Sequence, residues 1–154
     1  MDQARRVALK AGGAWGVLSA FAALGLMTPA QATAARNDVA FDATSMVAAL
    51  RALGVDAPTP SDQIEITAPE VAENGAMVRV AVASALPGTA LVALLIDRNP
   101  NTLAALFRLP AGTEAAIETR VKMAESSALT AIVRAGGRFY VAHREVKVTV
   151  GGCG

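Results

Sequence analysis

The sequence of 154 residues predicts a mainly β domain, a two-sheet sandwich with one short helix before its strands. Apolar and polar residues alternate in several short stretches of the second half, as in strands with one buried face. Gly, Pro and Asn punctuate these stretches about every 8–12 residues, a spacing typical of turns in β-sandwiches. Apolar residues at helical spacing precede the strands, between residues 44 and 54.

The first 34 residues have the organisation of an export signal. A basic start with Arg5, Arg6 and Lys10 precedes an apolar stretch, and Ala32-Thr33-Ala34 offers the small-x-small pattern that signal peptidase cleaves. A membrane-spanning helix is the alternative, but the apolar stretch over residues 14–27 is shorter than the ~18–20 residues that such a helix needs.

The pair Arg5-Arg6, followed two residues later by Leu-Lys, resembles a twin-arginine signal, which carries folded cargo. We therefore expect export by the twin-arginine route to the periplasm, and no membrane association after cleavage. Cleavage after Ala34 removes three of 14 basic and one of 13 acidic residues, which leaves 11 against 12 and a net charge of −1. This balance does not suggest a nucleic-acid partner, which would need a concentrated basic face.

One helix is expected at the start of the exported domain. Thr44 or Ser45 is suited to cap it, apolar residues recur at helical spacing, and Gly54 is suited to end it. Pro58 and Pro60 then make a continued helix unfavourable.

Short strands follow, separated by turns. The run Thr89–Ile96 is nearly all apolar, so it fits either a strand buried on both faces or a helix. Within it, residues 90–96, together with Phe107, could belong to the core or to an interface, and we favour the core. The other expected elements of this region are alternation at Ile64 and Ile66, strands at 77–83 and 105–109, and a turn at 97–101.

The last third shows the clearest strand pattern. Residues 117–123 alternate strictly, and strands at 129–134 and 138–143 flank a three-residue hairpin loop, Ala135-Gly136-Gly137. A further strand at 146–150 runs into the terminal glycines. Seven or eight short strands after one helix predict an immunoglobulin-like β-sandwich, although the Cys…Trp…Cys core of antibody domains is absent.

Counting residues excludes most catalytic sites. One His and one Cys cannot make a zinc site of the usual kind, so no metal is expected. A Ser-His-Asp arrangement would have to use His143, which shares a strand face with Phe139 and Val141 and is better explained as a packed or edge residue. No Gly-rich phosphate loop is present, and the carboxylates are scattered.

The single cysteine, Cys153, stands out by its position. It lies between Gly151-Gly152 and Gly154, and glycines give a backbone its greatest freedom. A chain-end residue without a role is one interpretation. A slim flexible arm that reaches about 10 Å beyond Val150 is the interpretation we favour, because it suits delivery of a bound group into another protein's active site. No fixed cation is evident beside the thiol, so its pKa is expected near the ordinary ~8.5.

At this tail the chain resembles a known family. Asn99-Pro100-Asn101, the segment 120–125, and 146–154 with its Gly-Gly-Cys-Gly end are similar to SoxY, the sulfur-carrier subunit of the thiosulfate-oxidising Sox complex. The likeness extends over nearly the whole chain, which then divides into a twin-arginine signal peptide at 1–34, a β-sandwich domain at 35–150 and a carrier arm at 151–154. The family arm ends Gly-Gly-Cys-Gly-Gly, so this sequence is one glycine shorter, and we expect an effect on partner affinity rather than on attachment.

The resemblance implies a carrier, not an enzyme, with no cofactor other than sulfur intermediates bound covalently to Cys153. Thiosulfate would be joined to Cys153 as a cysteine S-thiosulfonate by a c-type cytochrome enzyme. A hydrolase would release sulfate, and a sulfane dehydrogenase would oxidise the remaining sulfur, unless that sulfur is transferred onward. The resemblance also implies a heterodimer with a SoxZ-like subunit. Arg144 and Lys147 could help to position anionic adducts, but ordinary solvated charges are the favoured interpretation.

Two other functions remain open from the residues alone. The chain could be a structural β-sandwich whose terminal thiol cross-links two copies. It could also be an autonomous thiol enzyme such as a sulfurtransferase, although no base or activating cation is evident near Cys153.

Overall fold

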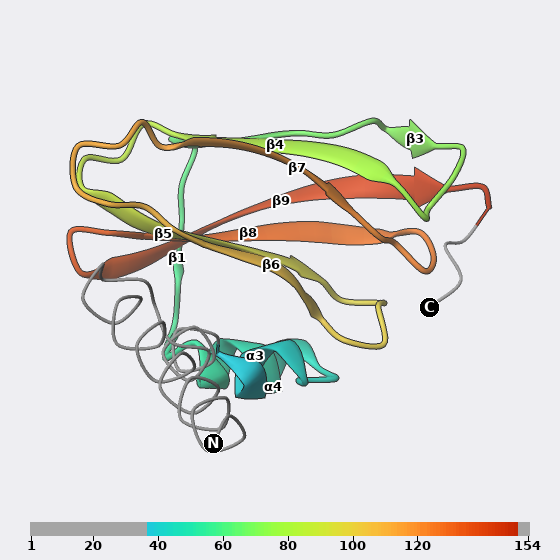
Figure 1. The fold of residues 1–154 in the computed structure, drawn as a ribbon, viewed down its shortest axis with the longest axis horizontal. Helices are drawn as coiled ribbons and strands as arrows, with labels where there is room; N and C mark the ends of the chain where they lie inside the picture. The colour runs from blue at the N-terminus through green and yellow to red at the C-terminus, as the bar shows by residue number, and fades with distance from the viewer. Residues whose placement is uncertain (1–36, 151–154) are drawn as a thin grey trace, which may run out of the picture. The chain divides into compact units, whose positions relative to one another are not determined.

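The structure, a computed structural model, describes residues 37–150 (Figure 1). The predicted export signal with Arg5 and Arg6 lies outside the described residues. The predicted arm, Gly151, Gly152, Cys153 and Gly154, also lies outside them.

The described residues form two helices followed by nine strands, so the prediction of a mainly β fold is confirmed. Their bounds are α3 Asp38–Phe41, α4 Met46–Ala52, β1 Thr59–Pro60, β2 Ile64–Thr67, β3 Val71–Ala72, β4 Val78–Ser84, β5 Thr89–Ile96, β6 Leu103–Arg108, β7 Ala116–Val121, β8 Ser127–Ala135 and β9 Arg138–Val148.

The strands make two sheets that face each other. The larger has the order β1-β9-β8-β5-β6, with β3 paired to another part of β9, and the smaller has the order β2-β4-β7. Neighbours are antiparallel except that β1 and β3 both run parallel to β9. The two sheets enclose the main core, and the pair of short helices lies against the other face of the larger sheet (Figure 1).

Burial on both faces explains the unbroken apolar run of β5. Val92, Leu94 and Ile96 point into the core between the sheets, whereas Ala93 and Leu95 point into the second core, beneath the helices. All five are fully buried. The run is therefore a strand, not a helix. It is apolar throughout its centre because both faces of the larger sheet are covered, so neither side of β5 meets water there.

The sequence assigned residues 90–96 to the core. The structure confirms this for residues 92–96 and not for residues 90 and 91. Ala90 is exposed and Leu91 is half-buried. Phe107 on β6 is also half-buried and packs against the core between the sheets.

Helix α4 confirms the expected helix and its cap. The Ser45 Oγ accepts a hydrogen bond from the Ala48 amide at 3.3 Å, and Gly54 takes a left-handed φ of +69° just after the helix. The preceding helix α3 was not expected, because four residues are too few to show a helical period. Asn37 caps it by accepting from the Ala40 amide at 3.1 Å.

The β8–β9 hairpin differs from its prediction. Ala135 pairs with Arg138 and is the last residue of β8, so the loop has two residues, Gly136 and Gly137, rather than three. Their φ angles of +56° and +78° are those of a type I′ turn, whose twist matches that of the flanking strands.

Strand β9 is also longer than predicted. The two strands expected at 138–143 and 146–150 are one strand of 11 residues, which remains paired with β8 through Arg144 and Glu145. Its polar residues at 143–145 look like an interruption in the sequence, but they are simply exposed.

Two short strands, β1 and β3, were not expected. Each has two residues and pairs with β9, β1 at Tyr140 and Val141 and β3 at Lys147 and Val148. They leave no periodic pattern in the sequence, because their strand geometry comes from the ladder on β9.

Two buried threonines offer a test of polar packing. The Thr130 Oγ1 lies 2.9 Å from His143 Nδ1, whereas the Thr102 Oγ1 has no hydrogen-bond partner among the described residues. We expect Thr130→Val to lower the free energy of unfolding by about 1 kcal/mol, and Thr102→Val to leave it unchanged or raise it. Chemical denaturation of the two variants measures both values, and an equal loss in both would contradict this account.

Candidate functional site

The described part of the predicted site is the base of the C-terminal arm. Cys153 lies three residues after Val150, which is the last described residue and is 63% exposed. Strand β9 ends at Val148, two residues before Val150, so the hydrogen bonds at the end of this strand (Figure 1) determine where the arm begins.

One edge of this strand end is held by the segment that contains β3. The Lys147 amide donates to the Glu70 carbonyl at 2.9 Å, and the Thr149 amide donates to the Ala72 carbonyl at 3.1 Å. Beyond β3, the Gly75 amide donates to the Val150 carbonyl at 2.8 Å. The ladder on this edge therefore continues to the residue that precedes the arm.

The turn at residues 73–77 reinforces this edge. The Thr149 hydroxyl donates to the Glu73 carbonyl at 3.1 Å, and the Gly75 carbonyl accepts from the Met123 amide at 2.7 Å. Asn74 shapes the turn, since its Oδ1 accepts from the Ala76 amide at 2.8 Å. Gly75 thus links the last residue of the arm base to the segment that follows β7.

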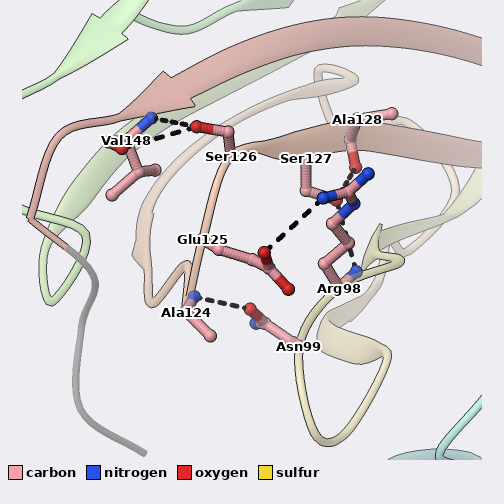
Figure 2. Close-up of polar contacts among 8 residues, drawn as sticks. All are labelled: Arg98, Asn99, Ala124, Glu125, Ser126, Ser127, Ala128 and Val148. Atoms are coloured by element: carbon pink, nitrogen blue, oxygen red, sulfur yellow. Dashed lines mark hydrogen bonds and ion pairs between the residues drawn. The ribbon is translucent and has the colours of Figure 1, made fainter.

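A serine holds the opposite edge. The pairing of β8 with β9 ends at Ser127 and Val146, and the Ser126 side chain continues it (Figure 2). Its Oγ accepts from the Val148 amide at 2.9 Å and donates to the Val148 carbonyl at 3.4 Å. The end of β9 is therefore bonded on both sides.

The turn between β5 and β6 forms hydrogen bonds with the chain on either side of Ser126. Asn99 accepts from the Ala124 amide at 2.9 Å and donates to the Lys122 carbonyl at 2.7 Å. The Arg98 amide donates to the Ser127 Oγ at 3.3 Å, as Figure 2 shows. The Arg98–Glu125 ion pair at 3.5 Å joins side chains that are both 61% exposed, so it contributes little.

The fold thus brings together segments that are far apart in the sequence. Three segments carried the family resemblance, at 99–101, 120–125 and 146–154. Asn99 bonds the second segment, and Ser126, just after the second segment, bonds the third at Val148. The described parts of all three lie at the end of the sandwich where β9 ends.

Three other residues considered from the sequence have identifiable positions. Arg144 is not a purely solvated charge, because its Nε donates to the Ala68 carbonyl at 3.1 Å. Lys147 is exposed, and its backbone amide, rather than its side chain, provides the hydrogen bond described above. His143 is exposed on β9, and its Nδ1 lies 2.9 Å from the Thr130 Oγ1.

The sequence did not point to Ser126, Thr149 or the Asn74-Gly75 turn as parts of the site. Asn-Gly was recognisable as a turn, but nothing local indicates that its amide reaches residue 150. Single hydroxyl residues carry no periodic signal at all.

Over residues 37–150, no three His, Cys, Asp or Glu side chains gather in a way that could hold a metal ion. No helix in that range is both long and apolar enough to cross a membrane. A surface hollow lined by Leu86, Thr89, Leu109 and Glu114 lies at the opposite end of the sheets from Val150, so it is not part of the arm base.

The hydroxyl of Thr149 provides a test of the arm base. We expect Thr149→Val to speed hydrogen exchange of the Lys147 and Thr149 amides about fivefold. The loss of one hydrogen bond lowers the free energy of local opening by about 1 kcal/mol. Exchange monitored by NMR measures the effect. Thr113→Val, an exposed threonine in the 109–115 loop, is the control and should leave these two amides unchanged. Equal exchange in all three proteins would show that the hydroxyl does not hold the arm base.

Comparison with known proteins assigns the family. The model of the sulfur oxidation protein SoxY matches residues 49–153, which include Cys153 and most of the described residues. The sulfur carrier protein SoxY from Chlorobium limicola f. thiosulfatophilum has a solved structure similar to this chain, with 36% identity and a TM-score of 0.62. That match covers 69% of this chain and 97% of the other.

Another solved structure shares the fold alone. The superoxide reductase (neelaredoxin) from Ignicoccus hospitalis is 19% identical with a TM-score of 0.50, over 56% of this chain and 80% of its own. No curated protein sequence matches this chain significantly. The family match and the 36% identical structure show that the chain belongs to the SoxY family of sulfur oxidation proteins.

Proposed function

We propose that this chain is a periplasmic sulfur carrier that holds thiosulfate-derived intermediates covalently on Cys153 and presents them to partner enzymes. The observation that carries the proposal is the position of the chain's single cysteine, five residues beyond the end of β9, which is hydrogen-bonded on both edges. Family membership, and the description of the Chlorobium relative as a sulfur carrier protein, support the same role.

The arm base suits a carrier because it separates a fixed part from a short tether. The last fixed point is Val150, and Gly151 and Gly152 place no side chain between it and the thiol. A thin tether of this kind fits a narrow active-site entrance. The fixed base limits the volume around Val150 that the thiol can occupy. Specific chemistry is then left to the partners.

The proposed chemistry begins with attachment. A bond forms between the Cys153 Sγ and the outer sulfur of thiosulfate, the thiol proton goes to water, and two electrons pass to a c-type cytochrome enzyme. The product is the cysteine S-thiosulfonate.

Release follows in two further steps on partner enzymes. A hydrolase adds water across the bond between the sulfane sulfur and the sulfonate sulfur, which releases sulfate and leaves a persulfide on Cys153. A sulfane dehydrogenase then oxidises the persulfide, or its sulfur passes to another acceptor.

Assembly and location complete the proposal. Residues 1–34, with Arg5 and Arg6, would direct a folded domain of residues 35–150 and its arm to the periplasm by the twin-arginine route. A SoxZ-like subunit would form a heterodimer with this chain and share its export.

Removal of the thiol tests the carrier role. We expect Cys153→Ser to abolish sulfur adducts and thiosulfate-dependent respiration while leaving the midpoint of thermal unfolding unchanged, because Cys153 lies beyond the hydrogen bonds that hold the end of β9. Mass spectrometry of the protein from cells grown on thiosulfate shows whether the adduct maps to Cys153.

Two outcomes would refute the proposal. One is an unmodified thiol in cells whose other pathway enzymes are active. The other is a disulfide-linked homodimer as the only functional form, which a non-reducing gel would reveal and which would indicate a cross-linking protein instead.

A further inference from the structure

The length of the arm limits where an enzyme can bind this chain. Three residues separate Val150 from Cys153, and an extended chain covers about 3.3–3.6 Å per residue, so the cysteine reaches only about 10 Å from the arm base. If the chain carries sulfur as proposed, every enzyme that acts on that sulfur must bring its active site within this radius. Each must then contact the surface around Val150.

That surface is unusually apolar for this domain. Five large hydrophobic side chains are strongly exposed among residues 37–150, and three of them lie at this end. They are Val71 at 49%, Met77 at 64% and Val150 at 63% exposed. The other two, Val39 and Val47, belong to the helices on the far face of the larger sheet.

Backbone hydrogen bonds hold the segments that carry these three residues. Val71 lies opposite Lys147 in the β3–β9 pair, and Val150 is bonded to Gly75. Met77 follows the same turn, and its amide lies 3.4 Å from the Asn74 carbonyl. An apolar surface on a fixed backbone can bind a partner without first being ordered, which lowers the entropic cost of binding.

Charge at this end gives no preference for one sign. Glu70 and Glu73 flank the apolar residues on one segment, and Lys122 and Lys147 are exposed on neighbouring ones. A partner selected by charge alone would need a single-signed patch. The feature available for recognition is therefore apolar contact, and Met77 adds a flexible side chain that adapts to more than one partner surface.

We propose that Val71, Met77 and Val150 form a docking collar for the enzymes that process the arm-bound sulfur. The matching surface on each enzyme is an apolar rim around the entrance to its active site, with the charged groups for the anionic adduct deeper in the channel. The inference rests on the proposed carrier function. It adds the surface by which a carrier without catalytic groups of its own is recognised.

The double variant Val71→Ser/Met77→Ser tests the collar in the exported protein, as the heterodimer proposed above. Cys153 is loaded with tetrathionate, whose thiosulfonate group is transferred to the thiolate as free thiosulfate leaves. Sulfate release by the partner hydrolase is then followed over a range of carrier concentrations. We expect KM for the loaded carrier to rise about tenfold while kcat stays within twofold, because the arm and its adduct are unchanged.

The control is Val47→Ser, which removes a side chain that is 69% exposed at the far face and should leave KM within twofold of the parent protein. Unchanged KM in the double variant would overturn the collar while leaving the carrier role intact. Absence of sulfate release from the loaded parent protein would instead overturn the carrier role. Loss of the heterodimer in the double variant, seen by sedimentation, would assign the surface to the SoxZ-like subunit, and conversion of a self-associated parent into a smaller species would assign it to a second copy; either result would overturn the collar.

Discussion

The hydrogen bonding of β9 along both of its edges is the constraint on which the rest of this structure depends. The strand pairs with β8 over nine residues on one edge and with β1 and β3 on the other. Beyond the last pair of β8 with β9, Ser127 and Val146, Ser126 continues the bonding, and beyond β3, Gly75 does so. A strand end that would otherwise fray is thereby fixed up to the residue before the arm.

A fixed base matters because ordering a chain costs about 1–2 kcal/mol of conformational entropy per residue. This cost is met during folding for residues up to Val150, with bonds that do not involve any partner. Under the proposed function, a partner enzyme then meets a chain that is already ordered up to Val150. The division between sandwich and arm lies at Val150, because the bonds described end at Val148 on the Ser126 edge and at Val150 on the Gly75 edge.

The larger sheet makes this arrangement possible because it is buried on both faces. One face packs against β2, β4 and β7, and the other packs against the two short helices. The central strand β5 is therefore almost entirely apolar and β8 is mostly so, and β9 joins this sheet along its length. The arm base is rigid because the strand that carries it belongs to the most deeply packed layer of the domain.

The sequence by itself determined the elements whose signals are local. Periodicity identified β2, β4, β7 and helix α4, paired glycines marked the β8–β9 hairpin, and the terminal Gly-Gly-Cys-Gly pointed to the thiol that we propose as the carrier. Only the tertiary structure decided the contacts of the arm base, because they join residues such as Glu73 and Thr149 that are 76 positions apart. Strands β1 and β3 also depended on it, since two residues have no period of their own and become strands only against β9. Local patterns record which face of an element is buried, whereas the partner of a single amide or hydroxyl is set by the way the whole chain packs.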